Sequence, residues 1–432
     1  MKLAIIGHGY VGLVTAAVFA DLGNNVVCVG RTAEKIENLK KGKLPFFEPG
    51  LEEVVKENIN AKRLVFTLDY KLAVSGADVV FICVGTPSLP TGEADLSSIF
   101  KSAEEIAKNL TGFSVIACKS TVPVGTNRKV ANILKKYKQK TSSFEIASCP
   151  EFLREGTALH DTLNPDRIII GVGSEKAKQI LLELHKPING QTVVTKIETA
   201  ELIKYASNTI LATKISFANE LAFFCEAVGA DIEEVIKGVG LDKRIGSEFL
   251  AAGIGYGGSC FPKDVKALVS MTKLYKTDCS LFSAVESVNK LAHEKFIEKI
   301  LKHFKSRIKG IKIGVLGLSF KPETDDMRDA PSIPIIKTLL INGADLVAYD
   351  PQAMNNAQSI FQGLKIKYMK NAYDACSDID ALLILTEWNE FKQLDLDKIK
   401  KMMKKPVVFD GRNIYDPAKM KKLGFIYYGV GR

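Results

Sequence analysis

The sequence lacks several features that would have placed it among membrane, secreted or metal-binding proteins. It has no run of about 18 apolar residues that could span a bilayer. None of its 8 cysteines stands at Cys-x-x-Cys spacing to another, and several lie inside apolar strands. This argues against a disulfide framework and against a zinc site. The apolar N-terminal run is followed by no Ala-x-Ala-like cleavage site. We therefore expect a cytosolic protein with no membrane partner and no metal.

No segment resembles a nucleic-acid-binding module, although the formal net charge is +10. Such a charge attracts anions in general, including phosphorylated small molecules. The densest basic run, Lys400–Lys405, is typical of a solvated lysine-rich surface. With 432 residues, 46% of them hydrophobic and 25% charged, the chain is a globular protein of two or three domains.

A glycine motif follows the first predicted strand, Lys2–Gly7. The segment Gly7-His8-Gly9-Tyr10-Val11-Gly12 leads from this strand into an apolar helix expected from about Val11 to Leu22. In this context Gly7 allows a tight turn, Gly9 lets the backbone approach a pyrophosphate, and Gly12 lets the helix pack on the strand. The start of the helix then faces the phosphates. The motif predicts a dinucleotide-binding domain.

The second predicted strand, Asn25–Gly30, lacks the acid that usually bonds the adenine ribose at its end. Gly30 and Arg31 stand there instead. An arginine at this position suits a 2′-phosphate, whereas an arginine that only stacks on the adenine would leave the cofactor as NAD. The sequence leaves both NAD and NADP open.

Further apolar strands alternate with helical patterns, which predicts a doubly wound parallel sheet. We expect these strands at Leu64–Thr67, Val79–Val84, Val115–Cys118 and Ile146–Cys149. Polar turns follow three of them, at Gly85–Pro87, Lys119–Pro123 and Cys149–Glu151. Because ligands bind at the carboxyl ends of parallel strands, these turns are expected to line one crevice. Thr121 and Glu151 could equally be helix caps.

A helix from about Thr199 to Val228 and a second α/β unit after it complete the predicted fold. The helical pattern contains no Pro or Gly until Gly229. A helix of roughly 30 residues would be about 45 Å long, so it should join two domains or pair with a copy of itself. Strands of a second parallel sheet are expected at Ile311–Leu318, Leu346–Tyr349, Ala381–Leu385, Val407–Phe409 and Phe425–Tyr428. The fold class is α/β, with two Rossmann-like domains joined by a long central helix.

The stretch Gly253–Asp264 combines a glycine-rich loop with a thiol at a predicted helix start. Pro262 fits the first position of that helix. Cys260 then lies just ahead of the helix N-terminus, where the dipole favours a thiolate, and Asp264 lies about one turn further on. Gly255, Gly257 and Gly258 let the backbone approach a ligand closely or take positive φ. A buried structural cysteine beside a tight turn is the alternative.

These motifs together resemble the UDP-glucose 6-dehydrogenases of the UDP-glucose/GDP-mannose dehydrogenase family, from end to end. The matching stretches are Gly7–Gly12, Thr121–Thr126, Pro150–Gly156, Pro165–Arg167, Glu201–Tyr205, Lys214–Phe217, Arg244–Gly246, Gly255–Asp264, Phe320–Arg328 and Asp410–Arg412. The sequence around Cys260 is similar to that of the UDP-glucose branch rather than to those of the GDP-mannose or UDP-N-acetylmannosamine branches.

The resemblance implies an oxidation of UDP-glucose to UDP-glucuronate with two hydride transfers to NAD. Cys260 is implied as the nucleophile that holds the aldehyde as a thiohemiacetal and then as a thioester, which water hydrolyses. Lys204 and Asn208 would stabilise the oxyanion. The residues implied to position and activate water or relay the proton are Asp264, Thr121 and Glu155.

The resemblance also implies binding residues, a dimer and domain limits. Cofactor-binding residues are implied at Gly7, Gly9, Tyr10, Val11, Gly12, Arg31, Lys35, Val84, Gly85, Thr86, Thr121, Glu155, Lys263 and Arg328. Substrate-binding residues are implied at Glu151, Phe152, Leu153, Arg154, Lys204, Asn208, Arg244, Phe249, Tyr256, Gly257, Cys260, Phe320, Lys321 and Arg412. Arg244 matches a residue that reaches across from a partner subunit, so we expect a homodimer through the long helix. The domains are expected at 1–196 (NAD(P)-binding), 197–295 (helical, dimerising, with the cysteine loop) and 296–432 (UDP-sugar-binding).

Two departures from the family pattern, and several alternatives, remain. Gly30-Arg31 replaces the usual acid, and Cys149 stands where the family usually has Asn, which could add an oxidation-prone thiol near the site. The alternatives are a related enzyme acting on GDP-mannose or a UDP-N-acetylhexosamine, an NADP-using variant, a two-electron dehydrogenase or epimerase with Cys260 merely packed, and a nucleotide-sensing scaffold without activity.

Overall fold

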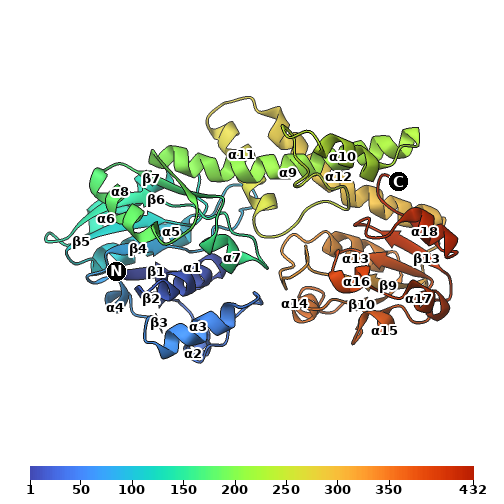
Figure 1. Ribbon diagram of the computed structural model, residues 1–432, viewed down its shortest axis with the longest axis horizontal. Helices are drawn as coiled ribbons and strands as arrows, with labels where there is room; N and C mark the ends of the chain where they lie inside the picture. Colours follow the sequence, from blue (N-terminus) through green and yellow to red (C-terminus); the bar gives the residue numbers. More distant parts are fainter. The chain divides into compact units, whose positions relative to one another are not determined.

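The computed structural model describes residues 1–432 and divides into two compact units, Met1–Ser207 and Asn208–Arg432. Each unit contains its own α/β sheet, and the division falls inside helix α9 (Ile197–Val228), which contributes residues to both (Figure 1). The α/β class and the long helix are as predicted. The three domain limits expected from the sequence stay a prediction. None of the helices is both long and apolar enough to cross a membrane.

The first unit is built on an eight-stranded sheet in the order β3-β2-β1-β4-β5-β6-β7-β8. All neighbouring strands run parallel except β6 and β7, which are antiparallel. The strands are β1 Lys2–Ile6, β2 Asn25–Val29, β3 Leu64–Thr67, β4 Val79–Ile82, β5 Phe113–Cys118, β6 Ser143–Ser148, β7 Arg167–Val172 and β8 Gln191–Thr195. The order reverses direction between β1 and β4, which is where ligands bind in sheets of this kind.

Helices cover both faces of this sheet, because successive strand residues point to opposite sides. Leu3 and Ile5 of β1 pack in one core cluster, whereas Ala4 and Ile6 pack in the other. The helices of this unit that precede α9 are α1 Tyr10–Asp21, α2 Ala33–Lys40, α3 Leu51–Asn60, α4 Tyr70–Val74, α5 Ser97–Asn109, α6 Thr126–Tyr137, α7 Ala158–Leu163 and α8 Glu175–His185. The strands are apolar along almost their whole length because both faces of the sheet are buried.

The second unit has a six-stranded, wholly parallel sheet in the order β11-β10-β9-β12-β13-β14. Its strands are β9 Lys312–Leu316, β10 Asp345–Tyr349, β11 Ile366–Tyr368, β12 Ala381–Ile384, β13 Val407–Asp410 and β14 Ile426–Tyr428. Its flanking helices are α13 Ser332–Ile341, α14 Met354–Ile360, α15 Ala372–Ala375, α16 Asn389–Lys392, α17 Leu396–Met402 and α18 Pro417–Lys422. The sheet echoes the first one, as predicted.

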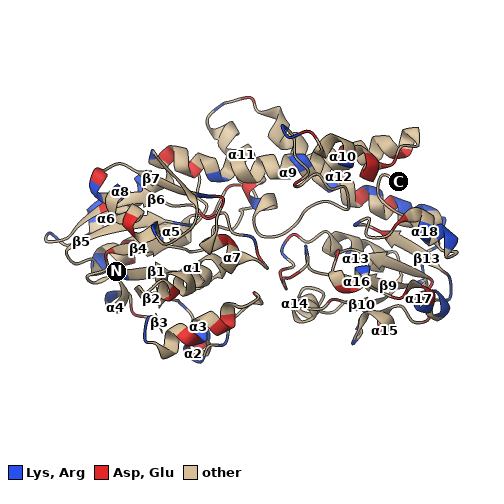
Figure 2. Cartoon of the chain, in the orientation of Figure 1, with Lys and Arg blue, Asp and Glu red and all other residues tan.

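Three further helices of the second unit support the cysteine loop: α10 Ile232–Gly240, α11 Phe261–Leu274 and α12 Ser280–His303. A small separate core, made of Ala212, Tyr256, Val265 and Val285, packs the loop and α11 against α9 and α12. The chain's Lys and Arg residues are spread over many elements (Figure 2). In the run Lys400–Lys405, Lys401, Lys404 and Lys405 are exposed, as predicted for a solvated surface.

Candidate active site

The glycine motif of the first unit has the geometry that its sequence predicted. Gly7 has a φ of +118°, and a Cβ there would lie 2.5 Å from the carbonyl oxygen of Cys83. A Cβ on Gly12 would lie 2.1 Å from the carbonyl oxygen of Gly7, so the helix can pack this closely only with glycine. Nothing lies within 4 Å of the corresponding position at Gly9, the residue just before α1. An open, side-chain-free helix start fits the pyrophosphate of a dinucleotide.

A basic cluster takes the place of the missing acid at the end of β2. A side chain at Gly30 would collide with Ile36 Cδ1 at 2.5 Å and with His8 Nδ1 at 2.9 Å, so this backbone position is filled by neighbours. Arg31 and Lys35 are exposed. Burial of the imidazole, together with the charges of Lys35 and Arg31, lowers the pKa of His8. The positive charges of Arg31 and Lys35 therefore both act on the end of β2, where the family usually has a carboxylate.

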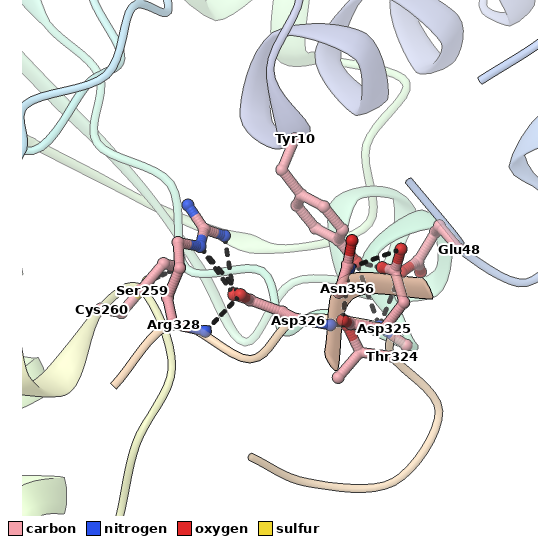
Figure 3. Close-up of polar contacts among 10 residues, drawn as sticks. Tyr10, Glu48, Ser259, Cys260, Thr324, Asp325, Asp326, Arg328 and Asn356 are labelled. Atoms are coloured by element: carbon pink, nitrogen blue, oxygen red, sulfur yellow. Dashed lines mark hydrogen bonds and ion pairs between the residues drawn. The ribbon is translucent and has the colours of Figure 1, made fainter. Parts of the chain in front are cut away.

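Glu48, which the sequence motifs did not single out, connects the glycine motif to the loop that carries Glu155. Its buried carboxylate accepts a hydrogen bond from the Tyr10 hydroxyl (Figure 3). It also accepts from Gly156 N at 2.6 Å and from Ala158 N at 2.7 Å. The Gly156 N–H also donates to Tyr10 Oη at 3.0 Å. Burial, followed by the bond to Glu48, raises the pKa of Tyr10. The tyrosine thus stays protonated and holds the Glu155 loop beside α1.

Lys204 lies in a buried ion pair with Glu151. Lys204 Nζ is 3.1 Å from Glu151 Oε1, with side chains that are 5% and 8% exposed. Lys204 Nζ also lies 5.1 Å from the centre of the Phe152 ring, and the Arg167 guanidinium lies 4.0 Å from the same ring. The first unit therefore brings together three of the predicted substrate residues. Their desolvated charges act more strongly on a substrate than exposed charges would.

Neither Thr121 nor Glu151 caps a helix, so the alternative left open by the sequence is excluded. The residue before α6 is Gly125 and the residue before α7 is Thr157. Glu151 Oε2 instead accepts from Leu153 N at 2.9 Å, and Thr121 O accepts from the Thr86 hydroxyl at 2.9 Å. The expectation that the turns after β4, β5 and β6 line one ligand crevice stays a prediction. Arg154 next to them pairs in bidentate fashion with Asp161.

In the second unit, Cys260 is the residue that precedes α11. The helix begins at Phe261, so Pro262 occupies the second rather than the first helical position. The residue is partly exposed, and the Ser259 hydroxyl lies 3.5 Å from its sulfur. A thiol at a helix start experiences the positive end of the dipole, which favours the thiolate. Six of the eight cysteines are buried, and Cys260 and Cys279 are the two that are partly exposed.

The loop before Cys260 is fixed residue by residue. Gly253 N donates to Asn219 Oδ1 at 2.8 Å, and Tyr256 exchanges backbone bonds with the Asn289 side chain at 2.8 and 3.0 Å. Gly258 has a φ of +85°, and a Cβ there would touch the Phe320 ring at 2.7 Å. The positive φ predicted as one role of these glycines is confirmed at Gly255 (+92°) and Gly258, whereas their close approach to a ligand stays a prediction. Such preorganisation fixes the thiol that follows.

Asp264 lies one turn into α11 and is fully buried. Its Oδ2 accepts a hydrogen bond of 2.6 Å from Asn208 Nδ2, and its Oδ1 pairs with Lys263 Nζ. The structure therefore brings Asn208 and Asp264 together, residues that the sequence separates by 56 positions. A buried carboxylate between an amide and an ammonium can hold a water or a proton in a fixed position.

The predicted UDP-sugar loop lies at the carboxyl edge of the second sheet. The Arg412 guanidinium donates to the carbonyls of Leu385 and Gly255 at 3.0 Å and of Phe320 at 3.4 Å. It thereby ties the Cys260 loop to the Phe320–Lys321 turn. Arg328 pairs with Asp326 in bidentate fashion, beside the contacts that Asn356 makes with Asp325 (Figure 3). The roles of Lys321 and Arg328 in ligand binding stay predictions.

Asp350, at the end of β10, is a second residue that the sequence motifs missed. Its buried carboxylate accepts from Leu318 N at 2.7 Å, from Ser319 N at 3.1 Å and from Trp388 Nε1 at 3.2 Å. In the first sheet this strand end would face a ribose. Here the acid bonds the turn after β9, which positions Phe320 and Lys321. Only tertiary structure reveals this role.

The remaining predicted substrate residues are placed differently. Phe249 has a φ of +63° and packs edge-on against Phe261, which also contacts Tyr256. Burial raises the pKa of Tyr256, so its hydroxyl stays protonated. Arg244 has a side chain that is 89% exposed and pairs with Asp242. Its role in reaching across to a partner subunit stays a prediction.

Cys149 does not have the reactivity expected of it. It is buried, and this burial raises the pKa of its thiol to about 12, although the charge of Lys119 opposes the rise. Oxidation-prone thiols are those with low pKa and solvent access. The sequence prediction of a second sensitive thiol is therefore wrong.

Three family models match the chain in the order of its structure. They describe the NAD binding domain (residues 1–189), the central domain (198–291) and the UDP binding domain (314–417) of one family. The chain belongs to the UDP-glucose/GDP-mannose dehydrogenase family. Among curated members, a UDP-glucose 6-dehydrogenase of Rhizobium meliloti is 48% identical and one of Bacillus subtilis is 47% identical. They match over 100% of this chain and over 100% and 93% of their own lengths, respectively.

Solved structures of family members have the same fold over the whole chain. A UDP-glucose dehydrogenase from Pyrobaculum islandicum has a TM-score of 0.92 at 37% identity and covers 99% of this chain and 97% of its own. A UDP-D-ManNAc dehydrogenase from Pyrococcus horikoshii has a TM-score of 0.88 at 28% identity and covers 100% and 99%. The match to the family's NAD binding domain supports NAD for the open glycine motif of the first unit.

Proposed function

We propose that this family member is a UDP-glucose 6-dehydrogenase, which oxidises UDP-glucose to UDP-glucuronate with two NAD through a covalent Cys260 intermediate. The observation that carries the proposal is the preformed loop that holds an accessible Cys260 at the start of α11, one turn before buried Asp264. Full-length relatives named UDP-glucose 6-dehydrogenase support the sugar. Higher identity to the archaeal UDP-glucose enzyme than to the UDP-D-ManNAc enzyme favours the same branch.

The residues of the first unit fit NAD, which when bound accepts one hydride per molecule. The open backbone at Gly9 and the start of α1 would hold its pyrophosphate, and the turn Val84–Thr86 after β4 would face it. The ammonium of Lys204 and the amide of Asn208 would stabilise negative charge on the substrate oxygen, an effect worth roughly 3–4 kcal/mol per donor in other enzymes. Glu151 would hold Lys204 for this purpose through their buried ion pair.

The reaction balances with no other reagent. The C6 alcohol first loses a hydride and a proton to become an aldehyde. The Cys260 thiol then adds across the C=O bond: its sulfur bonds to this carbon, and a proton equivalent to the thiol proton ends on the carbonyl oxygen as the hydroxyl of the thiohemiacetal. Loss of a second hydride and of the hydroxyl proton leaves a thioester. Water held by Asp264 then breaks the carbon–sulfur bond and releases the carboxylate. Covalent capture keeps the aldehyde from exchanging with solvent between the two oxidations.

The test is the amount of reduced cofactor formed per UDP-glucose when the sugar is limiting. Two equivalents and UDP-glucuronate as product are expected. One equivalent would identify a two-electron dehydrogenase, and none would identify an epimerase or a nucleotide-binding scaffold. GDP-mannose and UDP-N-acetylmannosamine, assayed in parallel, should turn over poorly if the UDP-glucose assignment is right.

A tolerance for NADP is supported by the basic cluster of His8, Arg31 and Lys35. A 2′-phosphate would meet two exposed cations there and no carboxylate from the end of β2. We predict that Arg31→Asp lowers kcat/KM with NADP about tenfold or more and changes kcat/KM with NAD by much less. Steady-state rates with both cofactors measure this. Equal and very poor use of NADP by both proteins would refute the prediction.

We also propose a homodimer formed through α9. Ile210, Phe217, Phe224 and Val228 are 58%, 50%, 64% and 58% exposed, respectively. They recur at spacings of seven, seven and four residues, which aligns them as one apolar stripe on the helix. Exposed apolar stripes of this kind mark interaction sites, and a repeating stripe is self-complementary across a two-fold axis. A second copy of this chain is therefore the expected partner.

Charge in the middle of this stripe should separate the subunits. We predict that Phe217→Glu shifts the protein to a monomer at micromolar concentration, because two carboxylates would be desolvated in the interface. Light scattering after size exclusion gives the mass. Ile341→Glu is the matched control, since Ile341 is 85% exposed at the end of α13 and outside the stripe. A dimer that survives Phe217→Glu, or one lost in the control, would contradict this arrangement.

A further inference from the structure

A buried carboxylate of α9 bonds the start of α6 in the first unit. Glu201 is 2% exposed, and its Oε2 accepts from Gly125 N at 2.7 Å. Its Oε1 accepts from Asn127 N at 2.9 Å and from Asn127 Nδ2 at 2.8 Å. Gly125 is the N-cap residue of α6 and Asn127 lies in its first turn; Gly125 has no side chain that could accept a hydrogen bond from this turn. A distant part of the chain thus supplies the helix cap.

The carboxylate holds Asn127 in an orientation that leaves its own oxygen without a partner. Asn127 is fully buried, its amide nitrogen donates to Glu201, and its Oδ1 has no hydrogen-bond partner. A buried acceptor without a donor is destabilising. Rotating the Asn127 amide by 180° would place its oxygen against the Glu201 carboxylate. Glu201 therefore prevents this rotation. The carboxylate thus fixes the orientation of the Asn127 side chain.

The loop fixed in this way carries Thr121, and it is stiff between Thr121 and α6. The Thr126 backbone N–H and hydroxyl donate to Pro123 O at 3.0 and 2.6 Å, and Gly125 has a φ of +86°. Val122 is buried in the core. The Thr121 carbonyl is bonded by Thr86 at the other end. A displacement of Gly125 would therefore move Thr121 by a similar distance.

Lys204 lies three residues after Glu201 on α9 and is buried as well. Residues at this spacing share one helix face. On that face Glu201 bonds the loop after β5 and Lys204 pairs with Glu151 in the loop after β6. The first turns of α9 therefore hold the two loops at a fixed separation. Glu201 does so by accepting hydrogen bonds from backbone N–H groups, whereas Lys204 does so through an ion pair between side chains.

We propose that Glu201 is a positioning residue for the oxidation, whose carboxylate holds the Thr121 loop in register with the Lys204 ammonium. It does not touch the substrate. This inference rests on the proposed function, because Thr121 and Lys204 act together only in that reaction. Loss of the carboxylate should leave the loops folded but misplaced by a fraction of an ångström, which lowers kcat and not the binding of UDP-glucose.

Glu201→Gln in the full chain tests this, with Glu198→Gln as the matched control. Glu198 lies one turn earlier on α9 and pairs with Arg128 of α6 through an exposed ion pair. We expect Glu201→Gln to lower kcat about tenfold to a hundredfold at 25 °C, with the Kd for UDP-glucose unchanged. Glu198→Gln should have the parental kcat. Glu201→Asp, which keeps the charge but is shorter, should recover part of the rate.

Each outcome decides between distinct failures. A Glu201→Gln protein with a lower Tm but the parental kcat would show a structural role only and overturn the proposal. If that variant does not fold, Glu201→Asp decides: a kcat below the parental value with an unchanged Kd for UDP-glucose is expected, and a parental kcat would overturn the proposal. A parent protein that forms no NADH from UDP-glucose would overturn the proposed function as well, whereas an active parent with an unaffected variant would overturn only the role of Glu201.

Discussion

Cys260→Ala is expected to bind UDP-glucose as the parent does and to form no UDP-glucuronate. The sulfur is the nucleophile of the proposed reaction, and removal of a nucleophile from other covalent enzymes costs at least about 10³-fold in kcat. The loop that holds residue 260 is fixed by bonds from Asn219 and Asn289, neither of which involves the thiol. The fold and the substrate pocket should therefore survive the change. Calorimetry with UDP-glucose and a discontinuous assay of UDP-glucuronate measure the two properties.

Cys279→Ala is the control for Cys260→Ala. Cys279 is the other thiol that is not buried, and it lies at the start of α12. It should have the parental rate, and iodoacetamide should inactivate the control protein while UDP-glucose protects it. Cys260→Ser should also be inactive, because an alcohol at neutral pH is a far weaker nucleophile than a thiolate. Parental product formation by Cys260→Ala would exclude the covalent route and favour a packed, structural cysteine.

The parts of the fold that could be predicted are those in which a local pattern has one physical solution. The glycine motif, the strands buried on both faces and the uninterrupted helix α9 were found within a few residues of their observed limits. Strands β7, β8 and β11 were not predicted. Residues 191–194 of β8 are exposed, so this strand lacks the apolar run that marks the central strands. Its place in the sheet depends on pairing with β7, which no local pattern encodes.

The candidate site divides in the same way. Cys260, Asp264 and the Gly7–Gly12 motif carry their chemistry in adjacent residues, so spacing reveals them. Glu48 and Asp350 act by accepting hydrogen bonds from backbone groups far along the chain, and any acid in a sequence could do so. The contact of Asn208 with Asp264 was not predicted, although the family resemblance implied a separate role for each of the two residues. Tertiary structure supplies those partners, which the sequence alone does not name.

Asp264→Asn is expected to stop the reaction after both oxidations, with the thioester still on Cys260. The carboxylate is fully buried and accepts from Asn208 at 2.6 Å and from Lys263. An asparagine has one acceptor oxygen for these two donors, and its amide NH₂ would face one of them. The charge that activates water is lost at the same time. General-base catalysis contributes about 10²–10⁴-fold in other enzymes, so kcat should fall by this order.

A rapid-mixing experiment separates this step from the hydride transfers. Asp264→Asn should release a burst of two NADH per active site and then turn over slowly, and the intact mass of the protein should increase by that of the bound acyl group. Asp278→Asn, which changes an exposed carboxylate between α11 and α12, should show neither effect. A burst of one NADH would place Asp264 before the second oxidation. A parental kcat with no covalent species would remove Asp264 from the mechanism, because its buried bonds to Asn208 and Lys263 would then serve the fold alone.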